Sequence, residues 1–225
     1  MKNVSFWVIQ VLLVLSLFGC SQGSEVHYDP PTTTTTATNS LKAWDHKSFP
    51  LIIYVPNEMN TYQQSIINSE DSWNNALGFE AFRFIFNDNS KLNTQWSKQY
   101  DSLYDNYFGL FKILSPNWNY TDINSGVLAF TGTLTQNGQI VHADVLFNFQ
   151  NYSFGDANDG SYNAQFIIDF ESVLTHELGH FLGLNHIATN EDPNSVMLPK
   201  ISRGAVKRIL SPGDIIRIKS LYNIP

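Results

Sequence analysis

The sequence predicts an α+β domain in which helices pack on a mixed β-sheet. Three observations predict it. An apolar run at residues 51–55 has the length and composition of a buried strand, and an amphipathic helical pattern follows at 61–77. Several more strand-like segments come next, two of them joined by a turn signal at 136–138. A strand, a helix and then a group of strands is typical of a sheet covered by helices.

The first half of the domain contains three predicted strands and one predicted helix. Leu51–Val55 lies between two prolines and suits a strand that is buried on both faces. From Thr61 to Leu77 apolar residues recur at near-helical spacing, and the glycine that follows is a stop signal. Phe82–Phe86 and Leu110–Leu114 indicate two further strands, because both are rich in aromatic and branched residues.

The second half begins with a predicted hairpin and ends with a predicted helix. Val127–Thr135 and Gln139–Phe149 have strand character, and the Gln-Asn-Gly sequence at 136–138 favours a tight turn between them. At 211–214 a serine, a proline and an aspartate precede a run of apolar residues. A capping side chain, a proline at the first helical position and an early acid together indicate a helix start.

A polar loop is expected at 151–163, where Asp156 and Asp159 alternate with glycines. Aspartates and carbonyls in a turning loop suit a hard cation, so this loop could bind Ca²⁺. The EF-hand spacing and its closing glutamate are absent, which favours a plain surface loop.

Length and charge limit the class of protein. A chain of 225 residues with 43% hydrophobic content can bury one sizeable core, so we expect one domain and a monomer. The formal net charge of -7 and the lack of any Lys and Arg cluster argue against a nucleic-acid partner, because phosphates must be met by clustered cations.

The N-terminus has the pattern of an export signal. Lys2 supplies a basic start, residues 4–18 are mostly apolar, and a small residue, Gly19, stands at an expected cleavage site. The segment that ends at Cys20 resembles the lipobox of bacterial lipoproteins, which implies cleavage before the cysteine and acylation of its thiol. An ordinary cleaved signal with an incidental cysteine is the alternative.

These features divide the chain into three parts. We expect a signal peptide at 1–19, a disordered tether rich in threonine and proline at 20–43, and the folded domain at 44–225. The protein is then exported and located in a bacterial cell envelope, lipid-anchored at the outer membrane or cell surface, or secreted. Cys20 is the single cysteine, so no intramolecular disulfide can form.

The strongest chemical signal lies in a helix predicted at 167–182. His176 and His180 are four residues apart, so a helix turns by about 400° between them and places both imidazoles on one face, within reach of one metal ion. Glu177 is displaced around the helix, which suits contact with a water on the metal rather than with the metal itself.

A third ligand is predicted beyond the end of this helix. Gly183 can adopt a positive φ that ends the helix, and the chain can then turn back to bring His186 to the same ion. Three protein ligands leave a fourth position open, which distinguishes a catalytic zinc site from a closed structural one.

With H-E-x-x-H-x-x-G-x-x-H at 176–186, the sequence resembles the metzincin metalloproteases, and among them the matrixin-like group, over residues 44–222. Met197, in the segment after the third histidine, matches the methionine that packs beneath the zinc in the family's Met-turn. The resemblance implies a twisted mixed sheet of five strands with an antiparallel edge strand, an active-site helix and a C-terminal helix.

The same resemblance implies where substrate binds. Residues 126–131 would form the antiparallel edge strand above the cleft, beside a strand at 141–147, and an extended peptide would pair with that edge. Pro199 and Ile201 would shape the wall of the pocket beyond the cut bond, and Ile201 stands where better-known members carry a tyrosine. The predicted substrate-binding residues on the edge strand are Val127, Leu128, Ala129 and Phe130.

Two features depart from the family pattern. Many matrixins bind a structural zinc through further histidines on these strands, whereas the matching positions here are Phe130 and Asp144, with His142 left alone. We therefore predict one catalytic Zn²⁺ and no structural zinc. The inhibitory prodomain cysteine is also absent, because Cys20 belongs to the signal, so latency through a thiol is not expected.

The sequence thus predicts a zinc-dependent endopeptidase that cleaves proteins or peptides with a metal-activated water and Glu177 as general base. The alternative is a catalytically silent zinc-binding surface lipoprotein that acts as a binding module, since a fold does not fix a function. A metal-dependent hydrolase acting on something other than peptides is a third hypothesis, and a long edge strand beside the motif argues against it.

Overall fold

The computed structural model describes residues 19–21, 42–91, 106–121 and 123–225. The predicted signal peptide and the predicted tether therefore lie outside the described residues, apart from a few residues at their ends. Within the described ranges, no helix combines the length and the apolar character needed to cross a membrane.

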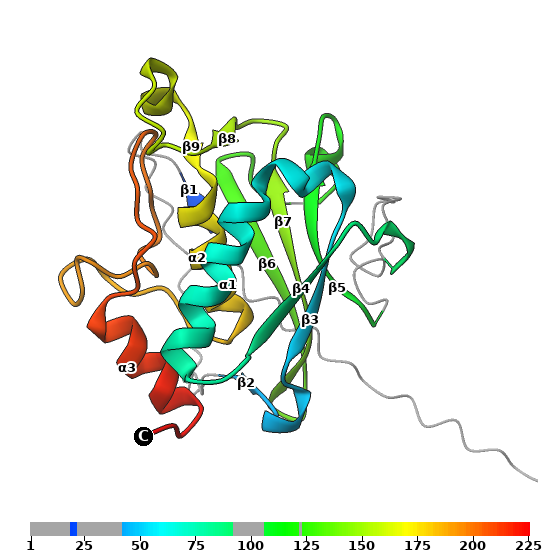
Figure 1. The fold of residues 1–225 in the computed structure, drawn as a ribbon, viewed down its shortest axis with the longest axis vertical. Helices are drawn as coiled ribbons and strands as arrows, with labels where there is room; N and C mark the ends of the chain where they lie inside the picture. Colours follow the sequence, from blue (N-terminus) through cyan, green and yellow to red (C-terminus); the bar gives the residue numbers. More distant parts are fainter. Residues whose placement is uncertain (1–18, 22–41, 92–105, 122) are drawn as a thin grey trace, which may run out of the picture.

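The core of the fold is one mixed sheet with the strand order β1-β6-β7-β5-β3-β4, and β2 pairs with β7 (Figure 1). The strands β7, β5, β3 and β4 are parallel to one another, whereas β6 is antiparallel to both β7 and β1. The strands of this sheet are β1 (Gly19–Ser21), β2 (Ala43–Trp44), β3 (Leu51–Val55), β4 (Phe82–Phe86), β5 (Phe108–Ile113), β6 (Val127–Gln136) and β7 (Gln139–Asn148).

The predicted mixed sheet with helices is confirmed, but its composition differs from the expected five strands. The sheet has seven strands because two short ones, β1 and β2, are added to it. The strand that was expected at the edge of the sheet, β6, is the second strand of the described sheet, because β1 pairs with its outer side. In this pairing Gly19 lies opposite Phe130 and Ser21 opposite Val127. Sequence patterns do not detect strands of two or three residues, because so few side chains cannot establish a periodicity.

The hairpin between β6 and β7 forms where it was predicted. Asn137 and Gly138 both have a positive φ, 52° and 80°, which a two-residue hairpin turn of the primed type requires. The ladder pairs Gln136 with Gln139 and continues along both strands to Ala129 opposite Phe147. This hairpin carries the predicted substrate-binding residues.

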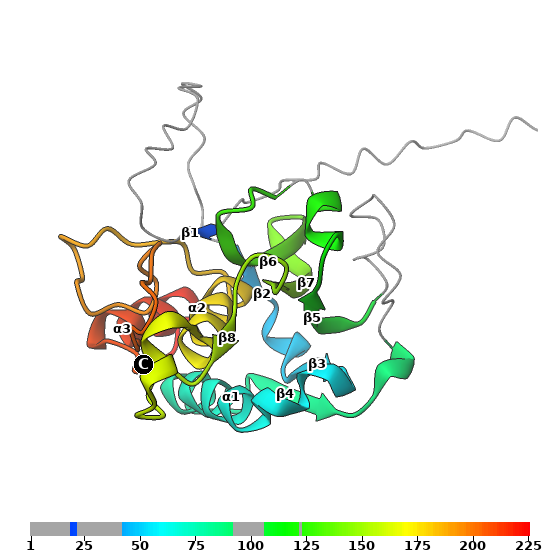
Figure 2. The same ribbon diagram turned by 90° about the horizontal axis from the view of Figure 1, so that it is seen from above.

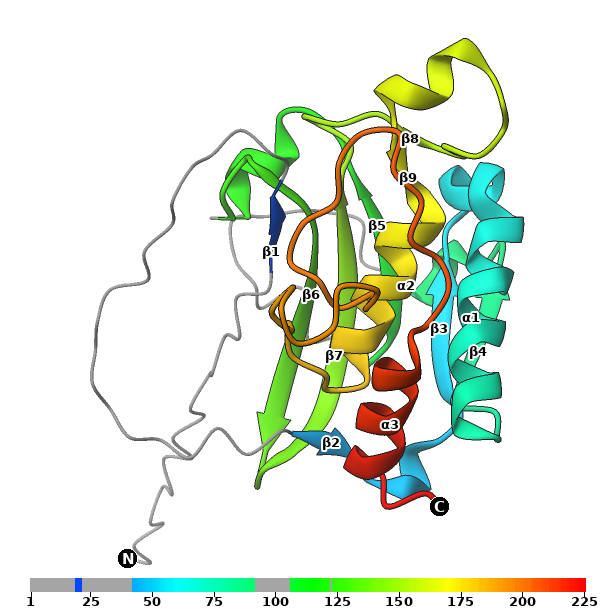
Figure 3. The ribbon, with the colours of Figure 1, turned by 90° about the vertical axis from the view of Figure 1, so that its left-hand side faces the viewer.

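Among the described residues three α-helices accompany the sheet, and α1 and α2 lie on the same face of it (Figure 3). Viewed from above, α2 lies over the β6 side and α1 over the β4 side (Figure 2). The helices are α1 (Gln63–Leu77), α2 (Phe170–Phe181) and α3 (Pro212–Leu221). Short 3₁₀ segments are η1 (His46–Ser48), η2 (Asn57–Tyr62), η3 (Asn89–Lys91), η5 (Asn117–Tyr120) and η6 (Tyr162–Phe166).

Two helix starts differ from the prediction. The helix expected from Thr61 begins at Gln63, because the preceding residues form the 3₁₀ segment η2. The helix expected at 167–182 begins at Phe170, because β9 (Ile168–Asp169) pairs in parallel with β8 (Phe154–Gly155) just before it. The loop predicted at 151–163 therefore contains one short strand and the start of η6.

Close packing between α1 and α2 fixes the helix that carries the histidines. Trp73 of α1 is fully buried, and its indole Nε1–H donates to the carbonyl of Thr175 at 2.9 Å. A Cβ on Gly179 would lie 2.3 Å from Met197 Sδ and 3.0 Å from a ring carbon of Trp73. Only glycine therefore lets both side chains approach α2 at this level.

Candidate active site

The helix α2 is buried on every side, and its start is capped. All twelve of its residues are buried. Asp169 is the N-cap, and its carboxylate accepts the backbone N–H of Ser172 at 2.9 Å. The capping carboxylate also binds Arg208, which ties the segment after residue 200 to the start of the helix. The histidine-bearing helix is thus fixed at its N-terminus before its functional residues begin.

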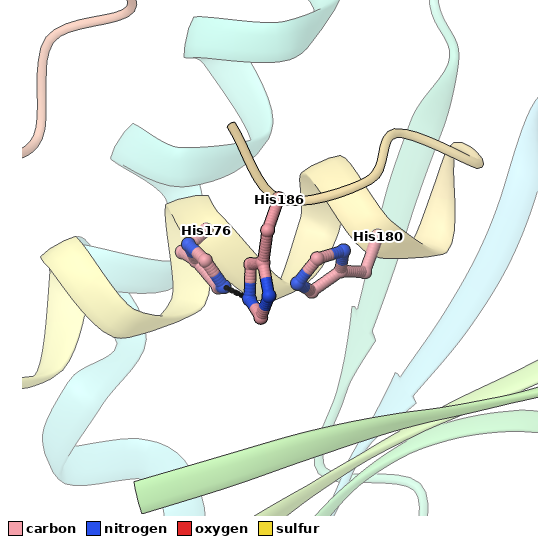
Figure 4. Close-up of side chains that lie close together, drawn as sticks. All are labelled: His176, His180 and His186. Carbon is pink, nitrogen blue, oxygen red and sulfur yellow. Dashed lines mark hydrogen bonds between the residues drawn. The ribbon is translucent and has the colours of Figure 1, made fainter. Parts of the chain in front are cut away.

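Three histidines converge at the C-terminal half of α2 (Figure 4). His176 and His180 project from the same face of the helix with ring centroids 4.5 Å apart, and His186 approaches from the segment that follows. One ligand atom from each of the three lies within 4.8 Å of the others. The structure therefore brings together all three predicted metal ligands.

Gly183 permits the chain reversal that brings in the third histidine. Its φ is 101°, and a Cβ at this position would lie 2.0 Å from the carbonyl oxygen of Lys42. The N–H of Leu184 then donates to the carbonyl of Gly179 at 2.9 Å, which closes the helix end. Both the backbone conformation and the space exclude any other residue here.

Backbone carbonyls determine which nitrogen of each helical histidine faces the common point. His176 Nδ1 lies 2.7 Å from the carbonyl oxygen of Val196, and His180 Nδ1 lies 2.7 Å from that of Leu184. A carbonyl can only accept, so both Nδ1 atoms carry the hydrogen. In the neutral rings the Nε2 lone pairs are then directed to the space between the histidines, as metal binding requires.

The surroundings of the three rings favour their neutral form. Burial lowers the pKa of His176 to about 4, against a smaller opposing effect of the Val196 carbonyl. Burial, with the nearby His176, lowers the pKa of His186 to about 3. The pKa of His180 is lowered well below its usual value, again mainly by burial. Neutral imidazole is the form that coordinates metals.

The segment that contains Met197 holds His176 through a backbone hydrogen bond. Met197 is fully buried, and the carbonyl of its neighbour Val196 accepts the His176 Nδ1–H. Asp214 of α3 in turn holds this segment, because its carboxylate accepts the Val196 N–H at 2.9 Å and the Ser195 hydroxyl at 2.6 Å. A continuous set of hydrogen bonds therefore runs from α3 to a candidate ligand.

Glu177 is completely buried beside the histidines. Its Oε2 accepts the Thr131 hydroxyl at 2.6 Å, whereas Oε1 has no hydrogen-bond partner among the described residues. Burial raises the pKa of Glu177 to about 8, although the hydrogen bonds from Thr131 act in the opposite direction. A buried carboxyl with one oxygen held and one available has the features of a proton acceptor in a catalytic site.

A cavity of about 10 Å³ lies beside His176. This is room for about one water molecule. Ile201 lines this cavity and Pro199 does not. The assignment of both residues to a substrate pocket stays a prediction. The other residues that line the cavity with His176 are Ser172, Val173, Val196, Leu198, Lys200 and Lys207.

The predicted substrate-binding residues of the hairpin all lie in β6. Leu128, Ala129 and Phe130 are buried and Val127 is half-buried, so their side chains belong mainly to the sheet's packing. What β6 can offer a ligand is its backbone edge, and in the structure that edge pairs with β1. Thr131, which sequence reasoning left without a role, is the residue of β6 that reaches Glu177.

Two further sequence predictions concern other ions. His142 is not alone, because its Nε2 lies 2.9 Å from Asp144 Oδ2 and both residues are buried. In the loop considered for calcium, the carboxylate of Asp156 pairs with Arg208, and that of Asp159 accepts the Ser161 N–H at 2.7 Å. The absence of a structural zinc and of calcium stays a prediction.

The donor set fits a zinc ion. Two nitrogens bound at about 2.0–2.1 Å to a tetrahedral Zn²⁺ lie about 3.3 Å apart. His176 Nε2 and His186 Nε2 are separated by 3.3 Å, and the third ring lies beside both. Three neutral imidazoles on a buried helix and the adjoining segment could hold one metal ion, and three protein ligands would leave a fourth position open.

Comparisons with known proteins agree with a candidate zinc site made of three histidines. A family model described as Matrixin matches residues 18–223, so the chain belongs to the matrixin family. Matrilysin of Felis catus is 52% identical over 56 residues, which are 24% of this chain and 20% of that protein. Metalloendoproteinase 5-MMP of Arabidopsis thaliana is 43% identical over 56 residues, 25% of this chain and 15% of that protein. The matched part thus spans a fifth or less of these relatives.

The buried histidines predict a pH dependence of stability in the metal-free protein. Below about pH 6.5 the unfolded chain binds protons on these histidines, whereas folded His186 binds one only near pH 3. Stability is therefore lost as the pH falls through this window. Replacing His186 with Asn should reduce the loss by about 1.4 kcal/mol per pH unit. Urea unfolding of the chelator-treated proteins between pH 4 and 7 measures the free energy of unfolding at each pH. The same dependence on pH for the unaltered protein and for His186→Asn would contradict the prediction.

The hydrogen bonds of Asp214 predict a coupling between α3 and metal affinity. An Asp214→Asn substitution should lower the free energy of unfolding by about 1.5–3 kcal/mol, because it weakens hydrogen bonds to a buried charge. It should also weaken zinc binding by about tenfold, since Val196 no longer holds His176 as firmly. Competition with a chromogenic chelator measures the affinity. Asp159→Asn, at an exposed position, is the control, and equal affinities for the two variants would refute the coupling.

Proposed function

We propose that this protein is a zinc-dependent endopeptidase. The observation that carries the proposal is the convergence of three buried imidazoles beside the buried carboxyl of Glu177. Membership of the matrixin family supports it, since that family implies zinc-dependent metalloendopeptidases. Relatives that match part of the chain are named matrilysin and metalloendoproteinase.

In this proposal His176, His180 and His186 hold the zinc and Met197 packs beneath it. Zinc bound at such a site lowers the pKa of a water to about 7 and polarises a carbonyl as a Lewis acid. The protein's part is to keep the three rings neutral, which burial does, and to orient His176 and His180, which the carbonyls of Val196 and Leu184 do. No protein side chain is needed as a nucleophile.

Glu177 acts as the general base and then as the general acid. Its Oε1 takes a proton from the attacking water, and the same carboxyl later gives the proton to the nitrogen of the departing amine. The raised pKa of about 8 belongs to the metal-free site, where burial alone acts on the carboxyl. A nearby cation favours the ionised form that a base requires.

The substrate is proposed to be an extended stretch of protein or peptide that pairs with β6. Main-chain pairing to a sheet edge gives affinity without a sequence requirement. The antiparallel pairing of β1 with β6 supports this, because it occupies the same positions, Val127 to Phe130, that we assign to substrate. A substrate would take the place of β1, and Pro199 and Ile201 would belong to the wall of the pocket that receives an adjoining side chain.

Export and lipid anchoring through Cys20 complete the proposal. Matrixins are in general extracellular, which agrees with an export signal. Cleavage before Cys20 would remove Gly19 and leave an acylated cysteine at the start of the mature chain. It would also remove one of the three residues of β1 and so weaken the strand that occupies the substrate edge.

The general-base role predicts a specific loss of activity. Glu177→Gln should retain zinc but lower turnover of casein by about 10²–10⁴-fold, because the amide cannot accept and transfer the proton. Glu58→Gln, at an exposed position, is the matched control and should behave as the unaltered protein. Unchanged turnover in Glu177→Gln rules out the assignment. Zinc-loaded protein that cleaves nothing, with or without a chelator, supports the binding-module alternative.

The anchoring proposal is tested by labelling. Cells that express the full chain with a radiolabelled fatty acid should incorporate label into the protein, and Cys20→Ser should abolish it because the acylated thiol is gone. Ser21→Ala is the control beside it and should retain the label. Equal labelling of the Cys20→Ser protein would show that the cysteine is not the attachment site.

A further inference from the structure

One hydrogen bond joins the sheet to the buried carboxyl of the site. The Thr131 hydroxyl lies 2.6 Å from Glu177 Oε2 and 3.0 Å from the backbone oxygen of the same residue. Both residues are completely buried. A hydroxyl-to-carboxyl hydrogen bond of this length is short, and it becomes charge-assisted when the carboxyl is ionised.

The hydroxyl is not needed for the strand itself. Thr131 lies in the middle of β6, opposite Val145 of β7, and a valine would fill the same volume with the same preference for a strand. A buried hydroxyl that did not bond would cost free energy, so its presence has a reason in its partner. Two hydrogen bonds of this hydroxyl are to Glu177, one to its carboxyl and one to its backbone oxygen.

The hydrogen bond leaves the two carboxylate oxygens in different situations. Oε2 is held by Thr131, and Oε1 is buried without a hydrogen-bond partner among the described residues. The terminal torsion of a glutamate side chain is otherwise broad, so an anchored oxygen is what fixes the direction of the free one. Misplacement of a catalytic group by about 1 Å can lower a rate by about 10²-fold.

We propose that Thr131 is a positioning residue that orients Glu177 for proton transfer. The inference rests on the proposed function, because it assigns a role within the same reaction. Since Thr131 belongs to β6, the strand along which we place the substrate also fixes the carboxyl that acts on it. The general base and the substrate edge then share one rigid element, and their separation is set by the sheet.

The test compares pairs of variants of the full chain that differ only in the hydroxyl. Thr131→Val removes it and keeps the volume, whereas Thr131→Ser keeps it and removes the methyl group. We expect kcat for a casein-derived peptide to fall by about 10–100-fold in Thr131→Val with KM within about twofold, and kcat to stay within about threefold in Thr131→Ser. Thr133→Val, on the same strand, is the control and should match the unaltered protein.

Two further measurements separate positioning from other roles. Zinc affinity should be close to that of the unaltered protein in the Ser and Val variants, because Thr131 contacts no candidate ligand. The melting temperature should stay close in Thr131→Ser and fall in Thr131→Val, because Glu177 Oε2 then loses its hydrogen-bond donor. If Thr131→Val does not fold, Thr131→Ala replaces it, since Ala and Ser differ from each other by the hydroxyl alone.

Three results would overturn the proposal. These are an unchanged kcat in the variant without the hydroxyl, an equal loss in Thr131→Ser, or a loss of zinc affinity that parallels the loss of kcat. Failure of the proposed function is distinguishable, because the unaltered zinc-loaded protein would then cleave no peptide at all.

Discussion

Two hydrogen bonds from imidazole to backbone carbonyl set the chemistry of this molecule. The carbonyls of Val196 and Leu184 fix the hydrogen of His176 and His180 on Nδ1, so each Nε2 is directed inward as a lone pair. Burial keeps the rings neutral. Without these bonds the helix would still present two histidines on one face, but nothing would select the tautomer or the ring orientation that a metal requires.

The site is held from two directions by separate parts of the fold. From the α3 side, Asp214 holds the segment whose carbonyl orients His176. From the sheet side, Thr131 holds Glu177. The fully buried helix α2 lies between them and carries both groups, one residue apart in the sequence. Candidate ligand and candidate base are therefore positioned independently, although they share a single turn of helix.

Local periodicity explains what could be predicted from the sequence. The convergence of His176 and His180 follows from helix geometry, and the reversal at Gly183 follows from the backbone freedom of glycine. The strand limits 51–55 and 82–86 were predicted correctly for a similar reason, since each run is short and rich in aromatic and branched residues.

What escaped prediction depends on partners that are distant in the chain. Thr131 and Glu177 are 46 residues apart, and no pattern in either segment indicates the other. The helix α2 starts three residues later than predicted, because pairing between β8 and β9 outweighs the local helical pattern. Lys207 lines the cavity beside His176, although it comes from a segment with no strand or helix signal.

The most direct test of this account is X-ray absorption spectroscopy at the zinc edge on the zinc-loaded full chain. The account predicts three nitrogen neighbours from imidazole at about 2.0–2.1 Å and one oxygen neighbour, with no sulfur. A sulfur neighbour at about 2.3 Å would assign a ligand role to Cys20, the one cysteine of the chain, and a shell of oxygens alone would place the metal elsewhere. Either result would contradict the three-histidine centre on which the proposed reaction rests.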